Sequence, residues 1–324
     1  MTGTQKRSKA HHVVPQFYLR AWANEEGKIS ARLRTGKVFE TGTEALAVEK
    51  DFYTAELPDG TKDALVEKAL AEVDDAGAAA HAALLRQEFP LEPEQKITFS
   101  VWLGLQWVRG RSSRAGSQEL ADKLQKMLIR MGLENAEVDS TEDDGAQVPP
   151  PIPEGARAGE SVPIPDLSHL TPKEREEIKQ DLDNVQFEMP RSLVLLQMLE
   201  MMAPAAMPFL EAEWHLLRFD GPLLLTSDEP IILQRNPRPE NRFLGVGPAS
   251  ADQIYVPLSP SLCLAIIRAG STGRQIVNQL PSAEAEKINA STVRTWWSQL
   301  FRHVNGPEFP KAVPDLPDER IAIN

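Results

Sequence analysis

The stretch Pro-Glu-Gln-Lys-Ile-Thr-Phe-Ser-Val-Trp-Leu-Gly-Leu-Gln-Trp-Val-Arg-Gly-Arg occupies residues 93–111. Its apolar residues form a stripe at Ile97, Val101, Leu105 and Val108, while Trp102, Leu103 and Trp107 cover much of the remaining surface. Spacings of three and four residues are typical of one helix face. A helix that is apolar on nearly all sides is buried, so this stretch predicts the central helix of the fold.

Two further helices flank the central one in sequence. Residues 61–86 are rich in alanine and predict a helix that is weakened by Gly77. Pro190 begins another, which we expect to run to the Met201-Met202 pair. A short helix is also expected from Pro15 to Trp22, followed by a hairpin of residues 28–34 and 37–40 about Thr35-Gly36.

Beyond Pro208 the sequence changes to patterns typical of strands. Residues 214–219 and 223–227 predict a hairpin, and further strands are expected at 231–233, 253–258 and 262–268. Ser282 is expected to cap a last helix that runs through Phe301. The predicted fold class is α+β, in which a helical core from the N-terminal half and the C-terminal helix packs with a mostly antiparallel sheet from the C-terminal half.

Residues 134–166 differ in composition from the rest of the chain, because an acidic run is followed by six prolines. Such a segment buries too little apolar area to offset the entropy lost on ordering. We interpret it as an acidic, Pro-rich loop or linker within a single α+β domain of residues 11–305. Residues 1–10 are expected to form a flexible N-terminus and residues 306–324 a surface tail. A capping box is predicted at Thr171 with Glu174.

Charge and composition exclude several classes of protein. A formal net charge of −12 opposes general binding to duplex DNA. The single cysteine, Cys263, excludes an intrachain disulfide, so we expect a cytoplasmic location. No stretch approaches the length needed to cross a bilayer, and no membrane association is expected.

The pair His11-His12 is the first candidate for chemistry, because it directly precedes a predicted helix. Imidazoles are suited to proton transfer, metal binding or anion capture near neutral pH. Glu67, Asp74 and His81 lie seven residues apart and form one row on the predicted helix 61–86. With His11 or His12 this row could bind a divalent metal, although we favour a solvated flank and retain only Glu67.

Gln106 and Arg109 lie three residues apart on the central helix, among tryptophan, leucine and valine. A buried guanidinium requires an anionic partner. That partner is either a structural carboxylate such as Glu67 or Asp228, or a phosphate or carboxylate of a bound ligand.

The segment Leu224-Leu225-Thr226-Ser227-Asp228-Glu229-Pro230 ends an apolar strand in polar residues. Polar groups at a strand end can be catalytic groups on a rigid support. Ser227 and Asp228 before a proline are equally suited to close a turn through backbone hydrogen bonds.

Six motifs together resemble the bacterial family known as domain of unknown function 4238. They are His-His-Val-Val-Pro-Gln-Phe-Tyr-Leu-Arg at 11–20, Asp51-Phe52-Tyr53, Glu67, Gln106-Trp107-Val108-Arg109, Leu225 to Pro230, and Val256-Pro257-Leu258-Ser259-Pro260. The resemblance runs from about His11 to Val304 and implies one continuous domain with no established activity. The recurrent polar positions it implies are His11, His12, Glu67, Gln106, Arg109, Ser227 and Asp228. The acidic, Pro-rich segment departs from the family pattern.

These observations leave three hypotheses open. In the first, the protein is a hydrolase of phosphodiester bonds in a nucleotide or single-stranded nucleic acid. Its catalytic residues are His11, His12, Glu67, Arg109 and Asp228, its substrate-binding residues are Gln106, Arg109 and Ser227, and a divalent metal is held by His12, Glu67 and Asp228. In the second, the same residues form a buried structural network in a non-catalytic binding or interaction protein. In the third, the protein is a receptor for a small anionic ligand.

Overall fold

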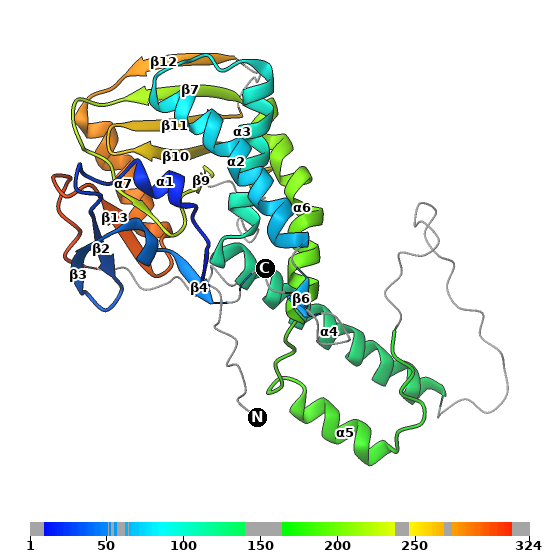
Figure 1. The fold of residues 1–324 in the computed structure, drawn as a ribbon. Coiled ribbons are helices and arrows are strands. Elements are labelled where there is room, and N and C mark those ends of the chain that lie inside the picture. Colours follow the sequence, from blue (N-terminus) through cyan, green and yellow to red (C-terminus); the bar gives the residue numbers. More distant parts are fainter. Residues whose placement is uncertain are drawn as a thin grey trace, which may run out of the picture. The chain divides into compact units, whose positions relative to one another are not determined.

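The computed structural model describes residues 10–50, 52, 55–56, 62–63, 65–139, 164–236, 246–268 and 274–312. The chain has the predicted α+β class (Figure 1). The expected flexible N-terminus, most of the predicted tail and most of the predicted linker lie outside the described residues. The chain divides into two compact units, one of residues 1–116 with 190–324 and one of residues 117–189, where the sequence was interpreted as a single interrupted domain.

Three helices pack side by side in the first unit: α2 (Leu65–Leu85), α3 (Pro93–Val108) and α6 (Arg191–Glu211). Helix α3 packs against both of the others, and the side chains of Trp102 and Leu103 are fully buried. The prediction of a central helix is therefore confirmed. Pro93 occupies its first position. Glu92 and Gln95 form a capping box, in which the side chain of each accepts from the backbone N–H of the other.

Two glycines allow these helices to approach closely. A Cβ atom added to Gly77 on α2 would lie 2.6 Å from Cδ1 of Trp102, and one added to Gly104 on α3 would lie 2.5 Å from the carbonyl oxygen of Met202 on α6. Gly77 lowers intrinsic helix propensity, as the sequence predicts, but it also provides the space that the Trp102 indole occupies.

Helix α6 is longer than predicted, because it continues past Met202 through Pro204 and Pro208. It is also long and apolar enough to cross a membrane, which corrects the expectation that no stretch approaches that length. Length and composition are weak evidence by themselves, since core helices of soluble proteins meet the same criteria. Within its unit, α6 packs on α3 and buries Leu195 and Phe209.

A five-stranded sheet covers one side of the helices and has the order β12-β7-β11-β10-β9. Its strands are β12 (Gln275–Gln279), β7 (Glu213–Arg218), β11 (Leu262–Ile267), β10 (Gln253–Ser259) and β9 (Ile232–Gln234). All neighbours are antiparallel except β12 and β7, which run parallel. Four of these strands were predicted; β12 was missed.

A second sheet of four strands has the order β3-β2-β13-β8. It contains β3 (Val38–Thr41), β2 (Ile29–Leu33), β13 (Gln299–Arg302) and β8 (Thr226–Ser227). The predicted hairpin of 214–219 with 223–227 is wrong, because β8 pairs with β13 and β7 pairs with β11 and β12. The last helix, α7 (Ser282–Thr295), also ends earlier than predicted, and Phe301 lies in β13.

Short elements complete the first unit. They are β1 (Ala10–His12), α1 (Gln16–Arg20), the 3-10 helix η1 (Thr43–Ala45), β4 (Val48–Lys50), β5 (Ala55–Glu56) and β6 (Lys62–Asp63). The hydroxyl of Tyr18 on α1 lies 2.8 Å from the Thr226 hydroxyl on β8 and donates to the carbonyl of Pro257 on β10. One buried side chain thus contacts both larger sheets.

The second unit contains most of α4 (Arg111–Asp139) and all of α5 (Pro172–Asp181). Residues 134–139 are helical, so the predicted start of the acidic linker at 134 is wrong. The capping box of Thr171 with Glu174 is confirmed. The Arg175 guanidinium donates to the carbonyl of Ala136 at 2.5 Å and holds α5 against α4.

Candidate functional site

The two N-terminal histidines contact different neighbours. They are consecutive residues in β1, and successive side chains of a strand point to opposite faces. His11 is buried, and its Nε2 lies 3.9 Å from a carboxylate oxygen of Glu67. His12 Nε2 lies 3.4 Å from the Gln16 amide, and burial lowers the pKa of His12 although backbone hydrogen bonds at η1 oppose that change. The imidazoles therefore do not converge on one point.

Arg109 lies at the end of α3 and is completely buried. Its terminal nitrogens donate to both carboxylate oxygens of Asp74 at 2.9 and 2.8 Å, and two of its nitrogens donate to the Gln106 side chain at 2.9 and 2.7 Å. The Trp102 indole donates to Asp74 at 3.1 Å, and Gln106 donates to the carbonyl of Val13 at 3.1 Å. We refer to Arg109, Asp74, Gln106 and Trp102 as the Arg109 cluster. The required anion is therefore a carboxylate of the protein, and it is neither Glu67 nor Asp228.

The row of Glu67, Asp74 and His81 is not the solvated flank that we favoured from the sequence. Asp74 belongs to the Arg109 cluster, and His81 is buried with its Nε2 3.1 Å from the carbonyl oxygen of Leu258. Burial lowers the pKa of His81 to about 4, so its imidazole is neutral at pH 7. Only Glu67, whose side chain is 39 % exposed, retains substantial contact with solvent.

Asp228 follows β8 directly, and its side chain is 3 % exposed. One carboxylate oxygen accepts from the backbone N–H of Trp297 at 3.0 Å. The other accepts from the N–H and hydroxyl of Ser298 at 2.8 and 2.6 Å and from the N–H of Gln299 at 3.2 Å. Burial raises the pKa of Asp228, while these donors and the nearby Arg111 oppose that change. The carboxylate holds the turn between α7 and β13.

Ser227 and Glu229 form the local turn around Asp228. The Ser227 hydroxyl accepts from the N–H of Glu229 and donates to its carbonyl, both at 3.0 Å, so the turn interpretation of Ser227 matches its contacts. The Glu229 carboxylate accepts from the N–H of Ser112 at 2.9 Å in the first turn of α4. Burial and the neighbouring Asp228 charge raise the pKa of Glu229 to about 7.

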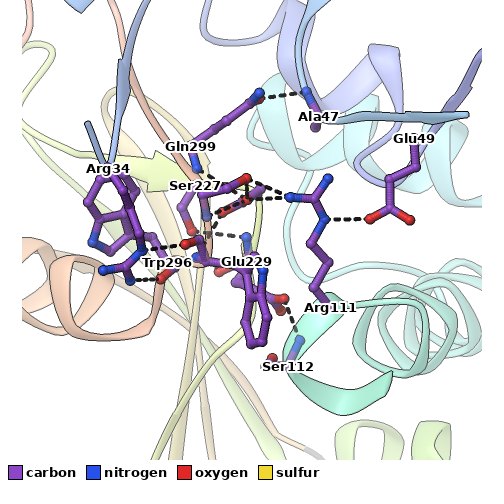
Figure 2. Close-up of polar contacts among 12 residues, drawn as sticks. Arg34, Ala47, Glu49, Arg111, Ser112, Ser227, Glu229, Trp296 and Gln299 are labelled. Atoms are coloured by element: carbon purple, nitrogen blue, oxygen red, sulfur yellow. Dashed lines mark hydrogen bonds and ion pairs between the residues drawn. The ribbon is translucent and has the colours of Figure 1, made fainter. Parts of the chain in front are cut away.

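Two arginines that were not proposed as site residues, Arg111 and Arg114, join this region to the N-terminal segment, and Figure 2 shows the contacts of Arg111. Arg111 donates to Glu49 on β4 and, at 2.7 Å, to the Ser298 hydroxyl, and it lies 3.9 Å from Asp228. Arg114 donates to Glu49 at 2.7 Å. Burial alone would raise the pKa of Glu49, but Arg114 and Arg111 together lower it. The spacing of Arg109, Arg111 and Arg114 was the only sequence signal for this network.

We refer to Asp228, Glu229, Ser298, Arg111 and Glu49 as the Asp228 cluster. Figure 2 shows Arg111 reaching between Glu49 and the β8–β13 region, and Ser112 beneath Glu229. The structure places His11 beside Glu67 but does not gather His12, Glu67 and Asp228. Among the residues that the structure describes, no group of three or more His, Cys, Asp and Glu side chains could hold a metal ion.

A cavity of about 1050 Å³ lies elsewhere, at the edge of the five-stranded sheet where β9, β10 and α7 meet. Three arginines, Arg235, Arg268 and Arg294, are among its lining residues. None of the residues proposed from the sequence lines it. We refer to it as the arginine cleft.

Comparison with known proteins identifies a family but no individual relative. Neither the curated proteins nor the solved structures include a match to this chain. The model of a family described as a protein of unknown function (DUF4238) matches residues 10–301, nine-tenths of the chain and the same span that carries the six motifs. The chain therefore belongs to the DUF4238 family.

Proposed function

We propose that this protein is a non-catalytic binding protein in which the polar residues singled out from the sequence stabilise the fold. The observation that carries the proposal is the set of hydrogen bonds that the Asp228 carboxylate accepts. Its two oxygens accept four hydrogen bonds from Trp297, Ser298 and Gln299. A carboxylate that acts as a metal ligand or a base needs a lone pair directed at the metal or proton. Here one oxygen accepts three hydrogen bonds and the other accepts one, all from donors of the protein itself.

The Arg109 cluster supports the same proposal. An arginine that clamps a substrate phosphate needs free N–H groups facing the ligand. Asp74 and Gln106 instead accept from three different nitrogens of the buried guanidinium. The Arg109–Asp74 ion pair links α3 to α2. Gln106 of the same cluster donates to the carbonyl of Val13 and so holds the segment after β1 against these helices.

Hydrolysis of a phosphodiester is the second candidate, and one contact favours it. The His11 imidazole lies 3.9 Å from Glu67, and an imidazole beside a partly exposed carboxylate is a usual arrangement for a general base. In this form of the hydrolase, His11 and Glu67 perform the chemistry, while Asp228 and Arg109 hold the scaffold.

The test combines metal analysis with an activity screen. Purified wild-type protein and the variants Glu67→Gln, His12→Ala and Asp228→Asn are analysed for bound metal. Each is then assayed on nucleotides and single-stranded nucleic acids with added Mg²⁺, Mn²⁺ or Zn²⁺. We expect no turnover in any sample and a lowered melting temperature for Asp228→Asn.

Asp183→Asn, at an exposed carboxylate of the second unit, is the matched control and should melt like wild type. The outcome that contradicts the proposal is turnover by wild type that Glu67→Gln abolishes without changing the melting temperature. Because Glu67 is partly exposed, such a loss would reflect chemistry and not unfolding.

A further inference from the structure

The arginine cleft lies at an edge of the five-stranded sheet. Strand β9 is the last strand of that sheet, and α7 packs beside it. The amide of Gln234 on β9 donates to the Ser291 hydroxyl on α7 at 2.6 Å, which fixes the two walls relative to each other. The volume of about 1050 Å³ is at the upper end of the range for small-molecule sites.

Positive charge is concentrated at this cleft although the whole chain carries a net charge of −12. Arg235 follows β9, Arg268 follows β11, and Arg294 lies in the last turn of α7. Arg268 and Arg294 are exposed, and neither forms an ion pair within the described part of the chain. The described lining holds three arginines and one carboxylate, and a concave surface with a net positive charge concentrates anions.

The acidic residue of the described lining is already engaged. Asp252 accepts from the N–H of Asn236 at 2.8 Å, and its own backbone pairs with Gln234 and Arg268. This carboxylate therefore orders the backbone beneath the cleft. Arg268 and Arg294 are exposed residues of the lining, and a guanidinium group carries its hydrogen-bond donors in a planar arrangement that matches a phosphate.

The rest of the lining indicates the chemistry of the remaining part of an anionic ligand. Amide and hydroxyl groups come from Gln234, Asn236, Ser291 and Thr295, and the apolar part of the lining comes from aliphatic residues, among them Ile232, Leu233, Val246 and Ile267. No aromatic side chain is among the described lining residues. Single-stranded nucleic acids bind mainly by stacking their bases on aromatic rings, so this lining suits a polyhydroxylated molecule better than a nucleic acid strand.

We propose that the arginine cleft binds a small phosphomonoester with a polar, sugar-like body, held by Arg268 and Arg294. This inference rests on the proposed binding role and names the class of ligand. The two guanidinium groups contact the phosphate, while the amide and hydroxyl groups contact the body of the ligand. The ligand is bound and released without covalent change.

Isothermal titration calorimetry of the full chain tests this assignment. The probes are inorganic phosphate, ribose 5-phosphate, ribose and a ten-nucleotide single-stranded DNA. We expect saturable binding of ribose 5-phosphate and weaker binding of phosphate, with no binding of ribose. Arg268→Gln and Arg294→Gln should each weaken binding about tenfold, since each removes charge-assisted hydrogen bonds. The double variant should abolish measurable binding.

Arg86→Gln is the matched control, because Arg86 is an exposed arginine at the end of α2, far in sequence from the lining residues. It should bind like wild type. Absence of saturable binding of phosphate and ribose 5-phosphate to wild type would overturn the inference, as would equal affinity of wild type and the double variant. Tighter binding of the DNA than of ribose 5-phosphate would overturn the assigned ligand class. None of these outcomes produces turnover, so they are distinguishable from failure of the proposed function.

Discussion

The Arg109 and Asp228 clusters and the arginine cleft all contain several charged side chains. They differ in whether those side chains are paired with other groups of the protein. In the clusters, the guanidinium and carboxylate groups are buried or partly buried and hydrogen-bonded to the protein. In the cleft, Arg268 and Arg294 are exposed lining residues. The sequence motifs that we singled out contribute Arg109, Gln106, Asp228 and Glu229 to the clusters, whereas they contribute no residue to the cleft. A charged residue that stands out in the sequence can therefore serve the fold.

The largest effect is expected from Arg109→Met, which breaks the Arg109 cluster. Removing the buried partner of this ion pair leaves Asp74 with the Trp102 indole as its remaining described donor and should cost about 3–5 kcal/mol of unfolding free energy. Urea denaturation followed by circular dichroism measures this loss. Arg86→Gln, which breaks an exposed pair with Glu88, should leave the unfolding free energy close to that of wild type. If both variants lost the same unfolding free energy, the claim that the buried Arg109 contributes more to stability than the exposed Arg86 would be contradicted.

The second effect concerns pH and the Asp228 cluster. The pKa of Glu229 is raised from 4.5 to about 7, so between these values the folded state retains a proton that the unfolded state has released. Stability from this group is therefore greatest below pH 4.5 and falls as the pH rises to 7, by up to about 3 kcal/mol. Glu229→Gln retains an acceptor for the N–H of Ser112 and removes the titration.

The measurement is the difference in unfolding free energy between Glu229→Gln and wild type at pH 5 and at pH 8. The variant should gain relative to wild type as the pH rises. Glu49 has a lowered pKa, so its contribution to the unfolding free energy is lost as the pH falls, which is the opposite dependence. This contribution is present in both proteins and cancels in the difference. A difference that does not change with pH would show that Glu229 is ionised at pH 5 in the folded protein.

A smaller effect is expected at the wall of the Arg109 cluster. In Gly77→Ala, the new methyl group would lie 2.6 Å from Cδ1 of Trp102, whose indole donates to Asp74. Overpacking of this kind costs about 1–3 kcal/mol, which outweighs the gain of about 1 kcal/mol in helix propensity. Thermal unfolding should show a net loss. Stabilisation would mean that Trp102 can move away without disturbing the cluster.

The smallest effect on stability is expected in the arginine cleft. Arg268→Gln with Arg294→Gln should change the unfolding free energy by no more than about 0.5 kcal/mol, because exposed side chains without ion pairs contribute little. Denaturation in the absence of phosphate measures it. A loss above about 2 kcal/mol would place these arginines among the groups that hold the fold and remove the basis for a ligand site.

Local patterns made part of this structure predictable from the sequence. The apolar residues of α3 require burial of most of the helix, although Ile97 is 48 % exposed. Thr171 and Glu174 satisfy each other's backbone groups, and Gly36 with φ +89° closes the β2–β3 hairpin. The requirement for an anion beside Arg109 also followed from its apolar neighbours. Each of these predictions depends on residues close together in the chain.

The rest depends on pairings that no local pattern specifies. Strand β8 has two residues, and its partner β13 begins at Gln299, so the apolar run before Ser227 was assigned to the wrong neighbour. The partner of Arg109 was one of several acidic residues, and the sequence does not distinguish Asp74 from Glu67. The cleft arginines lie in three separate segments and share no spacing.

The bonds of Tyr18 impose an order on how this chain acquires its structure. Its hydroxyl contacts residues 208 and 239 positions later in the chain. At about 5–20 residues per second, a ribosome takes about 10–50 s to make the intervening polypeptide. During that interval the Tyr18 ring can pack on the rings of His81 and Trp102, which are made soon after it, but its hydroxyl has neither sheet partner. The bonds from Tyr18 to the two sheets therefore form late in synthesis, once Thr226 and Pro257 have been made.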